Sequence, residues 1–381
     1  MWRTYGSNVS RAPHWRIPPV ALVRTLEKPT PRRPTPPISS RNVGARGYAN
    51  QRTAADAPTW PIRTIGGVPR AEVLQDILGL ARAAEDADGN PPLSEQTLVN
   101  LRTSSGHPDS LLVFATYASD GNGIGEAGEE LAGVAVVSLP RGESQPGVLE
   151  LVVRPTYRNQ GVGSSLVRVL QDRRLPDLRV WSHGNHAAAV ELAGKAGFIP
   201  VRELWRMRQT RAALEATVPD AVVPDGVRLR TFEPGKDEQA WLEANAAAFA
   251  HHPEQGAMTR EDLESRMAED WFDPQGLILA VRESDGELLG FHWTKVHPRS
   301  GKHPAIGEVY VVGVTPAAQG MGLGKALTIA GIEHLHSLGL QAIMLYVDAD
   351  NTAAVALYRS LGFTRWDVDV MYAPGNTAGN L

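Results

Sequence analysis

Residues 307–327 read GEVYVVGVTPAAQGMGLGKAL, and this stretch decides how the surrounding chain folds. It predicts an apolar strand at Val309–Val314, a glycine-rich turn at Gln319–Gly324 and a helix directly after the turn. A turn of this kind aims several backbone N–H groups at one point, and the dipole of the following helix adds partial positive charge there. The stretch therefore predicts a binding site for a pyrophosphate.

A second strand and a short helix follow, and residues 345–363 read LYVDADNTAAVALYRSLGF. The strand is expected at Ile343–Val347 and leads to Asn351, and the helix after it carries Tyr358. A phenol one strand away from a phosphate cradle indicates transfer of a group from a phosphorylated carrier. Each part has a plainer interpretation when taken alone, because many glycine-rich turns bind nothing and many helix tyrosines are only half-buried.

The order of these parts is more specific than any one of them. Strand, Q-x-x-G-x-G, helix, strand, N-x-x-A-x-x-x-Y and Gly-Phe follow one another, and this order resembles the acetyl-CoA-binding half of the GNAT superfamily of N-acetyltransferases. The turn is unlike a Walker loop, since no Gly-Lys-Ser/Thr follows at the right spacing. The G-x-G-x-x-G order of dinucleotide folds is also absent.

The composition sets broad limits on the function. A chain of 381 residues is long enough for two domains. It contains no cysteine, which excludes a disulfide framework, a thiolate metal site and a cysteine nucleophile. The sequence contains no run of about eighteen apolar residues, so no transmembrane helix is predicted. We expect a cytoplasmic protein, most simply a monomer, that works away from membranes.

The charges are unevenly distributed along the chain. Residues 1–55 hold ten basic residues and one acid, which leaves 28 basic against 41 acidic residues in the remainder. An acidic body argues against nucleic acid as a partner. Residues 1–60 are rich in proline and arginine without a sustained apolar period, so we expect a disordered extension. A transit peptide, a functional arm and an extension from a misassigned start codon are the alternatives.

The glycine-rich pattern occurs twice. Residues 149–164 (LELVVRPTYRNQGVGS) align with residues 310–325 at a constant spacing of 161, and residues 186–198 align with residues 351–363. A period this long indicates two homologous domains. We expect an α/β fold of two tandem GNAT-type domains, each a mixed sheet flanked by helices. The predicted parts are an N-terminal domain at 61–214, a linker at 215–226 and a C-terminal domain at 227–381.

The two predicted domains differ where chemistry would occur. The first keeps a glycine cradle at Arg158–Gly163. The first-domain counterparts of Glu308, Asn351 and Tyr358 are Gly147, His186 and Ala193. We therefore expect the first domain to bind a carrier without catalysing transfer.

The tandem layout extends the resemblance to the mycothiol synthase family of tandem GNAT enzymes, over about residues 62–374. This resemblance implies transfer of acetyl from acetyl-CoA to the cysteinyl amine of a cysteine–glucosamine–inositol conjugate, with no metal. The alternatives are a tandem acetyltransferase for another amine, such as an aminoglycoside or a peptide N-terminus, and a non-catalytic acyl-CoA sensor. Retention of Glu308 and Tyr358 disfavours the sensor.

The resemblance also implies roles for individual residues. In the C-terminal domain it implies acetyl-CoA contacts from Val312, Gly313, Val314, Gln319, Gly320, Met321, Gly322, Leu323, Gly324, Lys325, Asn351, Thr352, Ala353, Ala354, Val355 and Ala356. In the N-terminal domain it implies a second carrier site at Leu151, Val152, Val153, Asn159, Gln160, Gly161, Val162, Gly163 and Ser164. Contacts with the acceptor are implied for Glu95, Glu254, Lys295, Glu308 and Tyr346.

The predicted catalytic residues suit the chemistry. The acceptor amine must be neutral to attack a thioester, and an α-amino group has a pKa of about 7.7–8. Glu308 is expected to accept its proton, and Tyr358 to give a proton or a hydrogen bond to the leaving thiolate. Backbone N–H groups near Val312 are expected to stabilise the oxyanion. The histidines that follow match no zinc spacing, and we interpret them as solvated or substrate-lining: His251, His252, His292, His297 and His303.

Overall fold

The computed structural model describes residues 60–375, except 104–109, 119–129, 140–145, 174, 176, 213–220, 251–252 and 300–303. Of Pro253 and Glu254 only the backbone is described. Residues 1–59 of the predicted extension and residues 215–220 of the predicted linker lie outside these residues. All described residues belong to one compact unit. Within them, no helix combines the length and the apolar character that a bilayer span requires.

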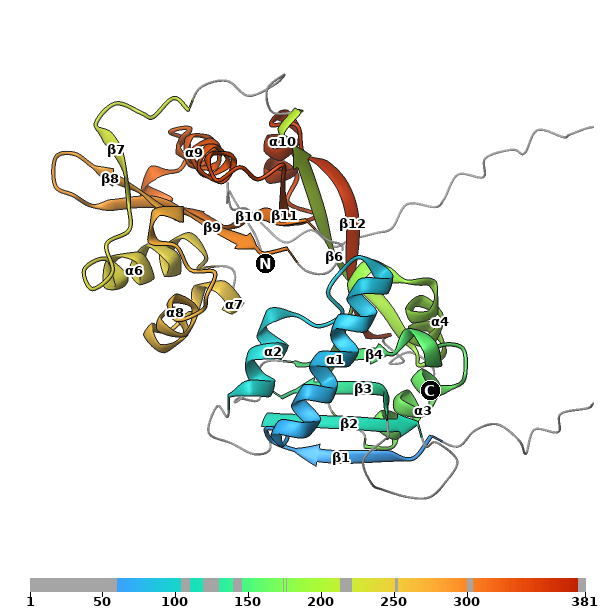
Figure 1. Cartoon of the computed structure of the whole chain (residues 1–381). Helices are drawn as coiled ribbons and strands as arrows, with labels where there is room; N and C mark the ends of the chain where they lie inside the picture. The colour runs from blue at the N-terminus through green and yellow to red at the C-terminus, as the bar shows by residue number, and fades with distance from the viewer. Residues whose placement is uncertain are drawn as a thin grey trace, which may run out of the picture. The chain divides into compact units, whose positions relative to one another are not determined.

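The elements are labelled as in Figure 1. The first half of the chain contains β1 (Ile62–Gly66), α1 (Ala71–Asp88), α2 (Glu95–Arg102), β2 (Leu111–Ala118), β3 (Glu130–Ser138), β4 (Gly147–Val153), η2 (Pro155–Tyr157), α3 (Val162–Asp172), β5 (Leu178–Ser182), η3 (His183–Asn185), α4 (Ala187–Lys195) and β6 (Phe198–Thr210). The second half contains β7 (Val227–Thr231), α6 (Glu238–Ala248), α7 (Pro253–Gly256), α8 (Arg260–Met267), η4 (Pro274–Gly276), β8 (Leu277–Arg282), β9 (Leu288–His297), β10 (Ile306–Val314), η5 (Pro316–Ala318), α9 (Leu323–Ser337), β11 (Ala342–Asp348), α10 (Thr352–Ser360) and β12 (Thr364–Pro374).

The strands form one twelve-stranded sheet in the order β1-β2-β3-β4-β5-β12-β6-β11-β10-β9-β8-β7. Two neighbouring pairs are parallel, β4 with β5 and β10 with β11. Each parallel pair opens toward its carboxyl end. β10 pairs with β11 over Gly307–Val309 but continues to Val314, and β4 pairs with β5 over Gly147–Glu150 but continues to Val153. The later residues of β10 and β4 therefore turn their free edge toward a gap between strands.

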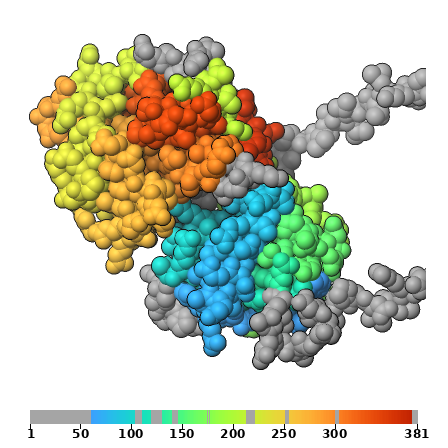
Figure 2. All heavy atoms as spheres, viewed as in Figure 1, coloured from blue at the N-terminus to red at the C-terminus, as the bar shows by residue number. Residues whose placement is uncertain are grey.

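Successive residues of the first-half strands enter two different cores. Val113 of β2 packs with Ile77 of α1, whereas Phe114 packs with Leu166 of α3. Because successive side chains of a strand point to opposite faces, α1 and α3 cover opposite faces of this part of the sheet. Figure 1 shows α1 and α2 lying across β2–β4, and in Figure 2 the two helices form a continuous blue-to-teal surface.

The second half repeats this arrangement with different helices. Leu279 of β8 packs with Trp241 of α6, whereas Ala280 packs with Leu327 of α9. Thr259 is the N-cap of α8. Its side chain accepts a hydrogen bond from the N–H of Asp262, and the Asp262 carboxylate accepts one from the N–H of Thr259. Helices α6 and α8 therefore belong to one face, and α9 and α10 to the other.

The last strands of the two halves exchange partners. β6 follows α4 in the sequence, yet it pairs with β11 along Leu204–Thr210 and with β12 along Phe198–Arg208. β12 in turn pairs with β5 through Val370–Tyr372. β12 therefore lies between β5 and β6, and β6 lies between β12 and β11. The backbone hydrogen bonds of each half are completed by a strand of the other.

Candidate active site

The glycine-rich turn between β10 and α9 has the geometry of a phosphate cradle. Gly320 and Gly322 have φ angles of 84° and 79°, in the left-handed region that favours glycine. A Cβ at either position would meet no atom within 4 Å, so the space outside the turn is open. Gly322 is the N-cap of α9, and no side chain of the described residues caps it. The first N–H groups of α9 are therefore available to an anion.

The predicted carrier strand lies next to this cradle. Val312, Gly313 and Val314 pair with β9 on one side and lie beyond the parallel pairing with β11 on the other. A Cβ at Gly313 would come within 2.8 Å of the Phe291 ring, so this position leaves no space for a side chain. An extended ligand could pair with the free edge of β10, as an added strand does.

Helix α10 forms the other predicted wall of the carrier site. The side chain of Asn351 accepts a hydrogen bond from the N–H of Ala354 at 3.1 Å and so caps the helix. Ala354 and Val355 are buried in the core, and only their backbone could meet a carrier. The remaining residues predicted on this wall, Thr352, Ala353 and Ala356, are exposed.

Tyr358, the predicted acid, is held by packing. Its side chain is 2% exposed, and its ring lies edge-on to Phe363 with the centroids 5.8 Å apart. It belongs to the same core as Leu323 at the start of α9. The phenol therefore belongs to a helix, α10, whose ring contacts are part of the core.

Glu308, the predicted base, lies near the start of β10. It is buried, and its Oε2 lies 2.6 Å from Nε2 of His297 on β9. Burial by itself raises the pKa of the Glu308 carboxyl. The hydrogen bond and charge of His297, with the charge of Lys295, outweigh burial and hold this pKa below its usual range. Glu308 is therefore ionised at neutral pH and available to accept a proton.

Lys295 brings the two halves of the chain together at this face. It pairs directly opposite Glu308 across β9 and β10. Its ammonium lies 3.0 Å from the carboxylate of Glu95, at the start of α2 in the first half. The same ammonium lies 4.3 Å from the ring centroid of Trp271 and 5.0 Å from that of Tyr310. The structure thus joins two predicted acceptor contacts that are 200 residues apart.

Two tyrosines border the same face. Tyr346, predicted to contact the acceptor, is half-buried on β11, and the guanidinium of Arg206 lies 5.8 Å from its ring centroid. Tyr310, which sequence analysis missed, accepts a hydrogen bond from Arg266 at 3.2 Å. Burial raises the pKa of both phenols, so both stay protonated at neutral pH. Tyr310 could have been found because it follows Glu308 by two residues on one strand.

A second buried cluster of charges was also missed. His183 in η3 lies 2.9 Å from Glu150 of β4 and 3.1 Å from Asp369 of β12. Burial by itself lowers the pKa of His183, but the hydrogen bonds to Asp369 and Glu150 raise it to about 10. Glu150 also accepts a hydrogen bond from the N–H of Ser94, the N-cap of α2. The cluster therefore links the second half to the helix that carries Glu95.

The first half keeps a cradle of the same construction. Asn159 and Gly161 have φ angles of 61° and 87°, and Gly161 is the N-cap of α3. The Arg158 guanidinium makes two hydrogen bonds of 2.7 Å to Asp88 at the end of α1. The other predicted first-half carrier residues follow one another on β4 and around this turn: Leu151, Val152, Val153, Gln160, Val162, Gly163 and Ser164.

The residue that the spacing of 161 aligns with Glu308 is a glycine in the first half. A Cβ at Gly147, the counterpart of Glu308, would lie 2.9 Å from Leu178 and 3.1 Å from Leu139. A side chain at this position would require the ends of Leu178 and Leu139 to move. The counterpart of Asn351, His186, lies 3.8 Å from Asp88, and the counterpart of Tyr358 is Ala193 on α4.

One predicted histidine, His292, lies in a different environment from the one expected, and several other predicted residues lie outside the described part of the chain. The interpretation of His292 as solvated or substrate-lining is wrong, because it is fully buried and its Nδ1 lies 2.7 Å from the carbonyl oxygen of Leu327 in α9. Burial lowers the pKa of His292 to about 4, so it is neutral. The side chains of Glu254, His251, His252 and His303 lie outside the described residues. Within the described ranges, no three or more His, Asp or Glu side chains are grouped to hold a metal ion.

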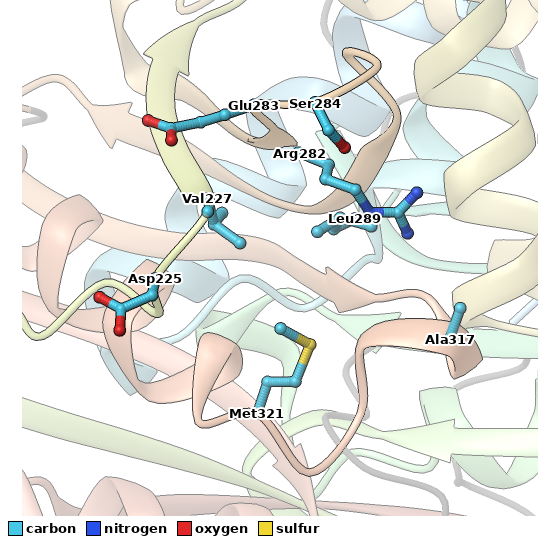
Figure 3. A pocket seen from close by; sticks show the side chains of 9 residues that line it. Asp225, Val227, Arg282, Glu283, Ser284, Leu289, Ala317 and Met321 are labelled. Atoms are coloured by element: carbon cyan, nitrogen blue, oxygen red, sulfur yellow. The ribbon is translucent and has the colours of Figure 1, made fainter.

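A hollow lies beside the cradle of the second half. Figure 3 shows the Met321 side chain rising from the glycine-rich turn toward Val227 and Leu289. Asp225, Arg282 and Glu283 also line it. Arg282 makes ion pairs with Asp285 and Glu287, so its charge is already balanced by two carboxylates.

Comparison with known proteins finds acetyltransferases. The model of the acetyltransferase (GNAT) family matches residues 94–198 and 240–363, which lie in the two predicted domains. The mycothiol acetyltransferase of Paenarthrobacter aurescens is 62% identical over 321 residues, or 84% of this chain and 98% of that protein. The mycothiol acetyltransferase of Thermobispora bispora is 52% identical over 297 residues, or 78% of this chain and 94% of that protein.

Solved structures share the fold. A GCN5-related N-acetyltransferase from Sphaerobacter thermophilus has a TM-score of 0.58 and 28% identity, and the match covers 83% of this chain and 96% of that chain. A tandem GNAT protein from the clavulanic acid biosynthesis pathway has a TM-score of 0.60 and 16% identity, and the match covers 84% of this chain and all of that chain. The predicted fold of two tandem GNAT domains is confirmed.

Proposed function

Because the chain belongs to the mycothiol acetyltransferases of the GNAT family, we propose that it transfers acetyl from acetyl-CoA to the cysteinyl amine of a cysteine–glucosamine–inositol conjugate. The observation that carries this proposal is the arrangement of β10. This strand presents the buried carboxylate of Glu308 near its start and, at Val312–Val314, a free edge that leads into the glycine cradle. Base and carrier site are thus parts of one rigid strand. We place this activity in the cytoplasm and expect a monomer.

The cradle and the free edge of β10 would hold the carrier. Acetyl-CoA supplies an acetyl thioester and a pyrophosphate; the open turn at Gly320 and Gly322 suits the pyrophosphate. The pantetheine arm is a polar chain that could pair with Val312–Val314, which lie beyond the partner strand. Backbone N–H groups at this edge are suited to stabilise the oxyanion of the transition state, an effect worth about 10²–10³ in kcat per donor.

Glu308 and Tyr358 would divide the two proton transfers. The ammonium of the acceptor gives a proton to the Glu308 carboxylate, and its nitrogen lone pair then attacks the thioester carbon. The tetrahedral intermediate collapses as the C–S bond breaks: the nitrogen releases its second proton to solvent, the CoA thiolate takes a proton from the Tyr358 phenol, and the phenolate regains one from solvent. The support is the ionised state of Glu308 and the fixed ring of Tyr358. A charged carboxylate beside Lys295 also suits an acceptor that carries both an ammonium and many hydroxyls.

The first half would bind the carrier without catalysing transfer. Its cradle at Asn159 and Gly161 repeats the left-handed turn of the second, while Gly147 stands where the spacing of 161 would place the carboxylate of Glu308. A calorimetric titration of acetyl-CoA into the chain and into Gly322→Glu tests this assignment, since the substitution fills the second cradle. We expect residual binding without turnover. Loss of all binding would show that the first cradle does not bind acetyl-CoA. Retained turnover would show that the active site is not in the second half.

Thiol profiling of a strain that lacks this chain tests the function. We expect mycothiol to disappear and its des-acetyl precursor to accumulate, and both to return to normal when the wild-type chain is supplied. The matched control is a strain complemented with Glu308→Gln, which should fail to restore mycothiol. An unchanged thiol profile would instead favour an acetyltransferase for another amine.

A further inference from the structure

We propose that His297 is a positioning residue, whose ring donates to one oxygen of Glu308, keeps the carboxylate ionised and leaves the other oxygen for the acceptor amine. This inference rests on the proposed function, because it concerns the base of that reaction. It assigns a use to a histidine that neither the motif nor the repeat singles out, at the end of the strand next to β10.

The register of the two strands brings His297 to Glu308. Lys295 lies directly opposite Glu308, and His297 lies opposite Ile306. Side chains two residues apart on a strand share a face, so Lys295 and His297 both project toward Glu308. The distance of 2.6 Å between Nε2 of His297 and Oε2 of Glu308 is short, as in hydrogen bonds that a charge assists.

Burial explains why the carboxylate needs this donor. The Glu308 side chain is 6% exposed, whereas that of His297 is 35% exposed, so the ring reaches from water to a nearly buried carboxylate. An ionised carboxylate away from water is unfavourable unless it accepts hydrogen bonds. Lys295 contributes its charge, but its ammonium is bound to Glu95. Within the described part of the chain, the hydrogen bond to the Glu308 carboxylate comes from His297.

Other charged or titratable groups near Glu308 act less directly. They are Lys295 of β9, Tyr310 of β10, Tyr346 of β11, and, beyond these, Glu95 of α2, Arg266 of α8, Arg206 of β6 and Asp367 and Asp369 of β12. The two phenols remain protonated at neutral pH, because burial raises the pKa of each. If His297 is removed, burial still raises the pKa of Glu308, and the charge of Lys295 is the main effect that remains to lower it.

The sign of the effect follows. His297 lowers the pKa of Glu308 and burial raises it, so loss of the donor raises the pKa of Glu308. The carboxylate is then protonated at a higher pH than in the wild type, and the base is lost from the acidic side of the activity profile. At high pH the carboxylate is ionised with or without His297, so activity recovers there.

The test compares two amides that differ in reach. Glutamine places its N–H₂ near the position of Nε2 and can still donate to Glu308, whereas asparagine is similar in polarity but too short. We expect His297→Gln, which keeps the hydrogen bond and loses the charge, to displace the acidic limb of the kcat/KM profile for the conjugate less than His297→Asn does. We expect the acidic limb of His297→Asn to move to higher pH, with about a tenfold loss on that side for each unit of displacement. The KM for acetyl-CoA should stay unchanged in both variants.

Three results would overturn the inference. One is a His297→Asn profile that overlays the wild type. Another is an equal loss at every pH together with a lower Tm, which is the sign of a merely structural role. The third is a further loss from His297→Asn in the Glu308→Gln background, where no carboxylate remains to be held.

A direct titration separates this inference from the proposed function. Carbon-13 NMR of glutamate side-chain carboxyls, with Glu308→Gln to assign the signal, gives the pKa of Glu308 without any assay of activity. We expect a higher pKa in His297→Asn than in the wild type, and an unchanged pKa would overturn the inference. If the wild type transfers no acetyl to the conjugate, the proposed function fails, and this titration still decides whether His297 holds the carboxylate.

Discussion

Glu308 and Tyr358 place the two proton transfers of the proposed reaction on different elements, a carboxylate on β10 and a phenol on α10. Both side chains are buried; the Glu308 carboxylate accepts a hydrogen bond from His297, and the Tyr358 ring packs edge-on against Phe363. Substitutions that remove the polar group but keep the shape should therefore affect the chemistry more than the binding of substrates.

We expect Tyr358→Phe to lower kcat by about 10²–10⁴-fold, the range of a general acid. The KM for acetyl-CoA should change little, because the ring that packs on Phe363 is retained. Steady-state kinetics across pH 6–9 measure both constants. A kcat that matches the wild type throughout would remove Tyr358 from the mechanism.

We expect Glu308→Gln to lower turnover, most strongly below pH about 7.7–8, where the acceptor amine is mostly charged and needs a base. A pH–rate profile with the conjugate measures this loss. Glu243→Gln, at an exposed position of α6, is the matched control and should leave the profile unchanged. If the Glu308→Gln profile equalled that of the control in height and shape, Glu308 would be a bystander.

The motif predicts single residues only where they lie within it. Glu308 and Tyr358 have fixed positions relative to the glycine-rich turn, so sequence alone could nominate them. His297 was interpreted only as solvated or substrate-lining, and its contact with Glu308 could not be predicted, because it depends on the register between β9 and β10. His183 and Asp369 are 186 residues apart, and no local pattern relates them.

At the scale of elements, α9 is held against the sheet by a buried histidine. The imidazole of His292 in β9 packs against Gly331 of α9. A Cβ on Gly331 would lie 2.0 Å from Cε1 of this ring. The same ring donates from Nδ1 to the carbonyl of Leu327, one turn earlier in α9. This contact sets the distance between the helix that begins at the cradle and the strand beside β10.

We expect Gly331→Ala to destabilise the chain by about 1–3 kcal/mol, as overpacking of a core does. It should also raise the KM for acetyl-CoA more than that for the acceptor, because α9 carries the cradle. Thermal unfolding and steady-state kinetics measure the two effects. Gly194→Ala, in helix α4, is the control, since a Cβ at Gly194 would meet no neighbouring atom within 4 Å. Equal Tm values for the two variants would contradict the packing argument.

The periodic elements were predicted well and their partners were not. The expected strands at 309–314 and 343–347 and the helices expected after each of them correspond to β10, β11, α9 and α10. The last strand of the chain, β12, shows what such patterns leave open. Its apolar pattern could not show that it pairs with β5 and β6, because the pattern of a strand specifies which face is buried and not which strand is beside it.

At the scale of the whole chain, the exchanged strands and the His183 cluster join the two halves. β12 completes the first half, β6 completes the second, and His183 links Glu150 to Asp369 in a buried position. This dependence gives a physical reason for the first half to persist without its own acid and base, since it also carries Glu95 to Lys295.

We expect stability to fall as pH rises from about 6.5 to about 10. The pKa of His183 is raised from 6.5 to about 10 in the folded chain, so its contribution is complete below 6.5 and is lost as pH rises through the folded value. Denaturant unfolding at several pH values measures this slope. His183→Gln should flatten it, whereas His186→Gln, at a half-exposed site near Asp88, should not. A slope unchanged in His183→Gln would contradict the assignment.

The central claim is acetyl transfer from acetyl-CoA to one particular amine. The most direct measurement is kcat/KM of the purified full chain for the cysteine–glucosamine–inositol conjugate, an aminoglycoside and a peptide N-terminus, with products identified by mass spectrometry. We predict one acetyl group on the cysteinyl nitrogen of the conjugate, and a kcat/KM for it well above those for the other two amines. A conjugate that is not acetylated, or that is acetylated no faster than the other amines, would contradict the claim.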